Sequence, residues 1–350
     1  MDVRLDRPAA RWPAVPGWPF ALALLLGAAV VAANSGAIRL GLADWQALLN
    51  GDDTQGALVL AQLRLPRVAF AVVVGAALGL AGALSQGLFR NPLAEPTLLG
   101  IPGGAICAVA LMLTVLSAWA GGLPAAWRPF AVPAAALAGA WAMCSLLQGL
   151  ARLLVPGAVA GLLLAGLALN AVAMAVVGLC TYVATDEQLR NLTFWQLGSL
   201  ALASWPVVIA LGTAVTAALL LARHWGQALN ALALGESVAA QVGVPVLRLR
   251  RLLVLALALL SGLAVAWCGL IGFVGLLAPH AARGLVGADA RRVLPLAAWF
   301  GAVLLLLADT AARTLVVPAE LPVGILTALF GAPVLFVLLK RAQREIGGGW

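Results

Sequence analysis

Long apolar runs, separated by glycine, proline and charged residues, dominate the hydropathy pattern of this chain. Stretches such as 252–260 and 303–307 are uninterrupted, whereas membrane β-strands alternate apolar and polar residues. A helix that crosses a bilayer needs about 20 mostly apolar residues, so the pattern predicts about ten crossings. The expected spans are 18–34, 62–88, 98–118, 128–150, 157–182, 195–222, 245–268, 273–286, 294–315 and 323–340.

The composition supports this pattern. Of the 350 residues, 63% are hydrophobic and 10% are charged, whereas soluble proteins are about half apolar. A water-soluble globule and a disordered chain are therefore excluded, and the fold class is an all-α polytopic membrane protein. The sequence shows no tandem repeat, low-complexity tract or soluble domain, so we expect residues 1–350 to form a single transmembrane domain. The first run also suits a cleavable signal peptide, but we prefer a retained helix because a chain with many later spans can insert without one.

The formal net charge of +8 is compatible with nucleic-acid binding or with basic loops retained in the cytoplasm. The second interpretation suits a membrane chain, and we expect no nucleic-acid partner. With a cytoplasmic N-terminus and ten crossings, 15 of the 21 Lys and Arg residues lie on the cytoplasmic side. The positive-inside rule then predicts that both termini are cytoplasmic.

One connection, 224–245, is too polar to cross the membrane. Its pattern predicts one or two short amphipathic helices with a break at Gly235, at the cytoplasmic face between the sixth and seventh spans. Such a helix can insert into a groove on a partner, although an ordinary interfacial helix has the same pattern. The arginines that follow, Arg248, Arg250 and Arg251, are expected to anchor the seventh span at anionic headgroups.

Chemical motifs are sparse. The lone lysine, Lys340, is followed by arginine, so the chain has no phosphate-binding GxxxxGK[ST] loop. The four cysteines lack CxxC spacing and fit small core residues. His280 has no second ligand nearby, which favours a structural hydrogen bond over a metal site. We therefore expect no catalytic residue, and no cofactor or metal bound by this chain.

Glycine and proline predict two local features. The segment Asn91-Pro-Leu-Ala-Glu-Pro96 predicts a rigid reversal after the second span, because proline cannot continue a helix and asparagine favours turns. Whether Glu95 contacts a partner is left open by the residues. The GxxxG pairs Gly75/Gly79 and Gly157/Gly161 predict close helix packing without specifying the neighbour.

Two arginines, Arg64 and Arg67, fall at the expected outer mouth of the second span, where the positive-inside rule disfavours them. A guanidinium binds a carboxylate through two parallel hydrogen bonds, so this pair suits docking of an acidic surface. Snorkelling to lipid headgroups explains the two residues equally well. Asp309 precedes Arg313 by one helical turn, which predicts an ion pair that either orients this arginine or is purely structural.

Several segments, taken together, resemble a known family. The residues that carry the likeness are Arg64-Leu-Pro-Arg67 with 74–82 and 86–100, then 233–245, then 269–283 with 308–313 and 320–333. In this order they resemble the permeases of binding-protein-dependent ABC importers for iron chelates and cobalamin, the FecCD or BtuC-like family. The likeness extends over most of the chain.

The resemblance implies a transport subunit of an ABC importer in the bacterial inner membrane, with no ATP site of its own. Such a permease acts as a homodimer in the lipid bilayer with two ATPase subunits, which hold ATP and Mg²⁺. It receives cargo from a periplasmic substrate-binding protein and moves it by alternating access. We expect haem as cargo, because 87–93 looks closer to haem permeases than to cobalamin permeases; ferric siderophore or cobalamin is the alternative.

The resemblance also implies roles for particular residues. Arg64, Arg67 and Arg313 match arginines that receive glutamates from the binding protein. The segment at about 227–245 matches the part that docks on the ATPase. The connection 155–161 matches the inner gate, although the small hydroxylated residues common there are absent, which leaves a hydrophobic constriction. The implied coupling residues are Ala233, Leu234, Gly235, Glu236, Ser237, Gln241 and Gly243, and the implied gate residues are Ala158, Val159 and Ala160.

Two other classes remain as alternatives. An ion-driven secondary transporter usually shows buried carboxylates or broken helices near the middle of the membrane, and Asp309 is the only acidic residue well inside an apolar run. An integral membrane enzyme would require a His, Asp or Glu cluster of catalytic spacing, which the sequence does not show.

Overall fold

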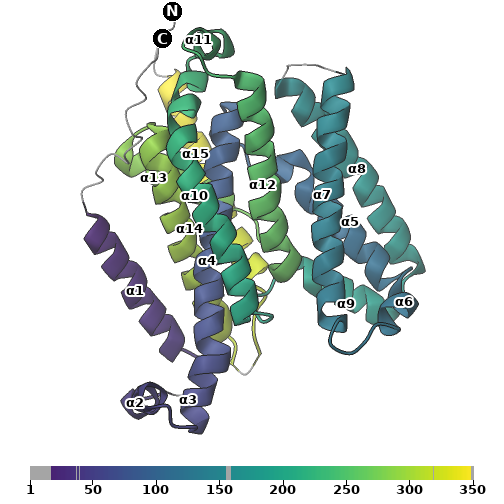
Figure 1. The fold of residues 1–350 in the computed structure, drawn as a ribbon, viewed down its shortest axis with the longest axis vertical. Coiled ribbons are helices and arrows are strands. Elements are labelled where there is room, and N and C mark those ends of the chain that lie inside the picture. Colours follow the sequence, from purple (N-terminus) through teal and green to yellow (C-terminus); the bar gives the residue numbers. More distant parts are fainter. Residues whose placement is uncertain (1–16, 37, 39, 155–158, 318, 348–350) are drawn as a thin grey trace, which may run out of the picture.

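The structure is a computed structural model that describes residues 17–36, 38, 40–154, 159–317 and 319–347. Within these ranges the chain forms helices and turns without a strand. In Figure 1 the long helices lie side by side, with α2 and α3 at one end of the bundle and α11 at the other. We call these the α2 end and the α11 end. The helices are α1 (Trp18–Asn34), α2 (Leu42–Asn50), α3 (Gln55–Val59), η1 (Leu60–Arg64), α4 (Leu65–Phe89), η2 (Pro96–Leu99), α5 (Ile101–Leu113), α6 (Ser117–Gly121), α7 (Arg128–Leu154), α8 (Val159–Val183), α9 (Asp186–Gln196), α10 (Trp205–Ala233), α11 (Glu236–Gln241), α12 (Val246–Cys268), α13 (Val274–Val286), α14 (Ala290–Thr314) and α15 (Val323–Gly347).

Six helical stretches in the described residues are long and apolar enough to cross a membrane, and three shorter apolar helices accompany them. Every predicted apolar run overlaps a helix, which confirms the all-helical membrane protein. The number of crossings, about ten, stays a prediction. The six stretches are Gln55–Phe89, Arg128–Leu150, Gly161–Val183, Trp205–Ala233, Val246–Cys268 and Ala290–Thr314, and the shorter helices are Trp18–Asn34, Ile101–Leu113 and Val323–Val337.

The sixth predicted run, 195–222, is displaced in the structure. Residues 197–204, between the end of α9 and the start of α10, are non-helical. Gly198 has φ +74°, and a Cβ there would lie 2.3 Å from the carbonyl oxygen of Leu270. Hydropathy does not detect this break, because the residues around it are apolar. At its other end α10 continues to Ala233, so that a single short helix, α11, follows where one or two were expected.

Helices α4 and α14 pack backbone to backbone in the core. The most apolar part of the helical stretch that contains α4 is 78% buried. A Cβ on Gly75 would lie 2.2 Å from the carbonyl oxygen of Gly301, and one on Gly79 would lie 2.2 Å from that of Ala297. The close packing predicted for this GxxxG pair is therefore confirmed, with α14 as the neighbour. Gly157, of the second predicted pair, lies outside the described residues.

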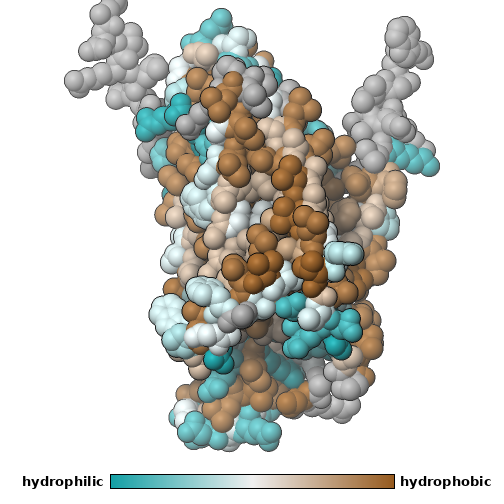
Figure 2. Space-filling view, turned by 90° about the vertical axis from the view of Figure 1, so that its right-hand side faces the viewer, coloured by the Kyte–Doolittle hydropathy of each residue, from teal (hydrophilic) through white to brown (hydrophobic). Residues whose placement is uncertain are grey.

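Helix α8, in contrast, lies at the edge of the bundle. Its most apolar stretch is 22% buried, and large side chains such as Leu164, Leu167 and Leu179 are exposed. Figure 2 looks onto the side of the molecule where α8 lies, and it shows hydrophobic residues over the middle of this face and hydrophilic residues toward both ends. An apolar belt between polar ends is the surface that a bilayer requires.

Two short helices, α5 and α13, begin after irregular segments inside the bundle. Asn91 Oδ1 accepts a hydrogen bond from the Leu93 N–H at 2.9 Å, which confirms the predicted reversal after α4. Glu95 Oε1 then accepts a hydrogen bond from the N–H of Phe273, also at 2.9 Å. Phe273 has φ +66° and precedes α13, so this carboxylate holds a strained backbone position at the start of the helix. The structure thus gives Glu95 a contact within the chain, and whether it also contacts a partner stays open.

Candidate functional site

Three arginines meet near the α2 end although they come from distant parts of the chain. Arg64 ends η1, Arg67 lies in the first turn of α4, and Arg313 lies in the last turn of α14. The packing of α4 on α14 brings these turns together, and we call the three residues the arginine cluster. The helical stretch begins at Gln55, seven residues before the span expected from residue 62, so Arg64 and Arg67 lie within the helix. Their place at the outer mouth of the membrane span stays a prediction.

Asp309 joins two members of the arginine cluster. Its side chain is 0% exposed. Oδ1 accepts hydrogen bonds from Arg67 Nε at 3.0 Å and from Arg67 Nη2 at 2.9 Å, and Oδ2 accepts one from Arg313 Nε at 2.9 Å. The ion pair predicted from the one-turn spacing is therefore confirmed. A buried carboxylate requires such partners, because an unpaired charge is costly in a medium of low dielectric constant.

Arg64 and Arg313 also hold the end of α1. The last carbonyls of a helix have no partner within the helix, and a cation near them interacts favourably with the helix dipole. Both arginines are largely buried by these contacts, at 7% and 8% exposure. This role could not be predicted from the sequence, because the acceptors are backbone atoms. The hydrogen bonds run from Arg64 Nη1 to Ala33 O at 2.8 Å, from Arg64 Nη2 to Ile38 O, from Arg313 Nη1 to Ser35 O at 3.0 Å and from Arg313 Nη2 to Ala32 O at 3.1 Å.

A cavity of about 270 Å³ opens beside the arginine cluster and is lined by all three arginines and by Glu320. The Glu320 side chain is 47% exposed, and its two carboxylate oxygens lie 2.9 and 3.1 Å from Arg67 Nη1. Three guanidinium groups against two carboxylates, those of Asp309 and Glu320, leave the cluster with one excess positive charge. A carboxylate from a partner protein therefore suits this cavity chemically.

The residues with an implied coupling role lie on and beside α11, at the opposite end of the bundle (Figure 1). Gly235 and Gly243 flank α11 with φ +123° and +83°, conformations that glycine adopts without steric cost. Ala239 is buried and holds α11 against the bundle. Most of the segment faces outward and is free to contact a partner. Its exposed residues from 233 to 243 are Ala233, Leu234, Ser237, Val238, Ala240, Gln241, Val242 and Gly243.

Glu236, the first residue of α11, ties this helix to its neighbours. Its Oε1 lies 2.8 Å from Arg250 Nη2 and 3.8 Å from Arg90 Nη2. Arg250 belongs to α12 and is 8% exposed. The expectation that Arg250 anchors the span at lipid headgroups is therefore wrong, because this side chain turns inward to the acidic residue.

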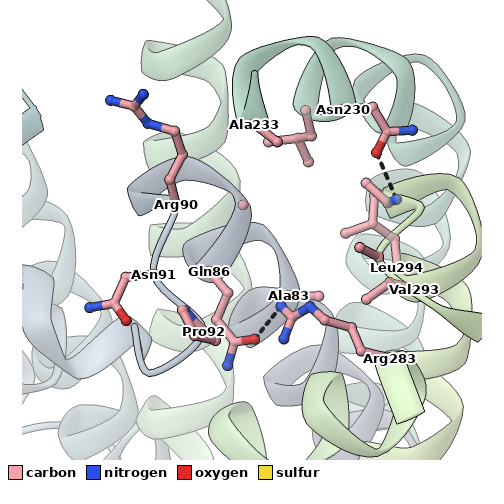
Figure 3. A pocket seen from close by; sticks show the side chains of 14 residues that line it. Ala83, Gln86, Arg90, Asn91, Pro92, Asn230, Ala233, Arg283, Val293 and Leu294 are labelled. Carbon is pink, nitrogen blue, oxygen red and sulfur yellow. Dashed lines mark hydrogen bonds between the residues drawn. The ribbon is translucent and has the colours of Figure 1, made fainter. Parts of the chain in front are cut away.

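A second cavity, of about 200 Å³, lies at the α11 end between α4, α10, α13 and α14. In Figure 3, Arg283 points toward Gln86 and donates a hydrogen bond to its amide oxygen. On the other side, Asn230 of α10 accepts a hydrogen bond from the N–H of Ala290 at 2.8 Å. These polar contacts join the ends of four helices directly beneath the exposed segment.

Asp289 caps the start of α14 beside this second cavity. Its carboxylate bonds to the side chain and the N–H of Arg291 and accepts a 2.7 Å hydrogen bond from Asn230 Nδ2. The hydrogen bond from the Arg291 side chain is the main cause that lowers the pKa of Asp289 to about 2. Burial, the second-largest effect, raises the pKa, and the hydrogen bonds from Asn230 and from the Arg291 N–H lower it further. The residue therefore stays ionised at neutral pH, as the positive end of a helix dipole favours.

The implied gate residues lie at the edge of the described chain. Ala158 is outside the described residues, and Val159 and Ala160 begin α8. The role assigned to them stays a prediction. Over the described ranges, no group of three or more His, Cys, Asp or Glu side chains is placed to hold a metal ion.

The same helical architecture occurs in a solved transporter. This structure is described as an inward-facing conformation of a metal-chelate type ABC transporter; it superimposes with a TM-score of 0.79 at 31% identity, over 92% of this chain and 98% of that chain. The fold thus defines the class, the permease of an ABC transporter. Residues 22–341 match the FecCD transport family, and the chain belongs to this family.

Two relatives of known name narrow the class to importers. The hemin transport system permease protein HmuU of Yersinia pestis is 42% identical over 330 residues, which are 94% of this chain and 96% of the relative. The vitamin B12 import system permease protein BtuC of Vibrio vulnificus (strain CMCP6) is 42% identical over 289 residues, which are 81% of this chain and 83% of the relative. The protein is an ABC importer permease, and permease subunits of this family lack an ATPase site of their own.

Proposed function

We propose that this permease imports haem across the bacterial inner membrane. The observation that carries the proposal is the identity to the hemin permease, 42% over 94% of the chain, against 39% over 93% of the chain for the vitamin B12 permease of Salmonella typhi. Residues 1–350 act as one transmembrane domain in a homodimer, whose symmetry gives a central path between two copies. The α2 end faces the periplasm, and both termini lie in the cytoplasm.

The arginine cluster is the docking site for the periplasmic binding protein. The cavity of about 270 Å³, the three guanidinium groups and the excess positive charge support this role. Arg67 is the member best placed for it, because its Nη1 already binds the half-exposed carboxylate of Glu320. Arg64 and Arg313 contribute to the positive potential while they hold α1.

The 227–245 segment docks on two separate ATPase subunits, which bind ATP and Mg²⁺. The exposure of Leu234, Ser237 and Gln241 supports this role, as does the short tether through Glu236 to Arg250. Movement of α11 is transmitted to α10 and α12, the helices joined to it by glycine and proline turns. Ala158, Val159 and Ala160 form the inner gate, which closes as a hydrophobic constriction. The chain itself binds no cofactor.

The experiment is reconstitution of the permease in liposomes with its ATPase and its binding protein, followed by ATP hydrolysis and uptake of haem. Haem-stimulated hydrolysis with accumulation inside supports the proposal. Hydrolysis that responds to a ferric siderophore or to cobalamin, but not to haem, changes the cargo and leaves the importer intact. Transport that survives without the ATPase and stops when the proton gradient is collapsed contradicts the ATP-driven mechanism.

A further inference from the structure

Glu320 occupies an unusual position at the rim of the cavity beside the arginine cluster. It lies in the connection between α14 and α15, near the α2 end, with its side chain 47% exposed. Arg67 directs Nε and Nη2 to the buried Asp309 and Nη1 to Glu320. One guanidinium thus binds two carboxylates, of which one is fixed in the core and the other is accessible from outside.

We propose that Glu320 is an internal competitor for docking: it occupies the accessible side of Arg67 in the free permease and is displaced by a carboxylate of the docking protein. This inference rests on the proposed docking role of the arginine cluster. It adds a residue that opposes docking and thereby sets its affinity.

The difference in burial between the two carboxylates decides which one can leave. Asp309 is 0% exposed and bonds to both Arg67 and Arg313, so its departure would strand two buried charges. Glu320 is bound through a single nitrogen and is close to solvent, where an ion pair contributes little to stability. Displacement of Glu320 therefore costs little and leaves the geometry of Arg67 unchanged.

The exchange also preserves the local charge. With Glu320 in place the cluster has one excess positive charge, and with an external carboxylate in its place the excess is again one. The binding protein consequently replaces an existing ion pair and does not create an additional one. We expect this to keep docking reversible, because Glu320 returns to Arg67 when the binding protein leaves.

The test measures the affinity of the cognate binding protein for the complete transporter, permease with ATPase, in lipid nanodiscs. Glu320→Gln removes the competing charge and keeps the shape of the side chain. We expect binding about two- to fivefold tighter, the range that corresponds to an exposed ion pair. Asp53→Asn is the matched control, because Asp53 is an exposed acid between α2 and α3, at the same end of the bundle. Its affinity should equal that of the wild type.

The same substitution in a permease that lacks Arg67 tests whether the effect of Glu320 depends on this arginine. In Arg67→Gln, the additional change Glu320→Gln should have no effect, because Glu320 acts only through Arg67. Unchanged or weaker binding of the Glu320→Gln single variant overturns the competitor role, as does an equal gain in the Asp53→Asn control, which would indicate a general effect of charge. If Arg67→Gln alone leaves the affinity unchanged, the proposed docking site itself is wrong. Basal ATP hydrolysis of every variant reports whether the complex is assembled.

Discussion

At the α2 end the central carboxylate, Asp309, is 0% exposed and binds two arginines that are themselves largely buried. At the α11 end the central carboxylate, Glu236, is 35% exposed, and one of its two arginine neighbours, Arg90, is 3.8 Å away and 41% exposed. The carboxylate is thus fixed in the core at the α2 end, whereas at the α11 end it is partly exposed, pairs closely with the buried Arg250 and lies farther from Arg90. This difference suits a rigid platform for docking and a movable contact for an ATPase.

The energies expected for the two arrangements differ accordingly. Loss of one partner from a buried ion pair costs about 3–5 kcal/mol, because the remaining charge is left without compensation. An exposed pair contributes only about 0–1 kcal/mol, since water and salt screen it. The contrast between the ends therefore predicts large effects on stability at the α2 end and effects mainly on coupling at the α11 end.

The largest effect is expected for Asp309→Asn. This change leaves Arg67 and Arg313 without their shared carboxylate, and we expect the free energy of unfolding to fall by about 3–5 kcal/mol. Reversible unfolding of the purified permease in detergent measures it, with Asp53→Asn as the control that removes an exposed charge at the same end. A loss below about 1 kcal/mol is no larger than the contribution of an exposed ion pair. It would mean that the ion pairs at the two ends do not differ in their contribution to stability.

A smaller, local effect is expected for Arg64→Gln, which removes a charged donor from the end of α1. Of the two hydrogen bonds of Arg64, the one to Ala33 O lies within α1. A hydrogen bond from a charged group contributes about 2 kcal/mol, so loss of this bond should accelerate amide hydrogen exchange in 30–36 roughly 30-fold. Arg128→Gln is the matched control, because Arg128 donates from an exposed site to the carbonyl of Leu123. Equal exchange in both variants would mean that α1 is held by its apolar contacts alone.

The sequence predicted the contacts that depend on local spacing. The pair Asp309–Arg313 follows from one helical turn, and the approach of Gly75 to α14 follows from a GxxxG pattern on an apolar helix. The helices themselves follow from hydropathy, except where an apolar segment such as 197–204 turns instead of continuing a helix.

Contacts between distant segments could not be predicted in the same way. Glu95 meets Phe273 across 178 positions, and Arg313 meets the carbonyl of Ala32 across 281. In both contacts one partner is a backbone atom, so residue identity carries no signal. The sequence marks Arg64 and Arg67 as unusual by their position, but the attachment of Arg64 and Arg313 to the end of α1 is seen only in the packed structure.

The prediction for the α11 end is a loss of coupling without a large loss of stability. Glu236→Gln should lower the free energy of unfolding by less than about 1 kcal/mol, while ATP hydrolysis stimulated by the loaded binding protein falls and basal hydrolysis persists. The reversed pair, Glu236→Arg with Arg250→Glu, should restore part of the stimulation, since the ion pair is formed again. Full stimulation in Glu236→Gln would show that α11 transmits movement without this tether.

The smallest effect concerns Asp289, at the same end. Its pKa in the folded protein is lowered from 3.8 to about 2, so its contribution to stability is complete above the unfolded value and is lost as the pH falls through the folded one. The difference in unfolding free energy between the wild type and Asp289→Asn should therefore be constant from pH 5 to 8 and shrink only below about pH 4. Denaturant titrations at several pH values measure it. A difference that changes between pH 5 and 8 would mean that another group titrates at the start of α14. A constant one means that Asp289 stays ionised across this range and that the cap at the start of α14 keeps its charge.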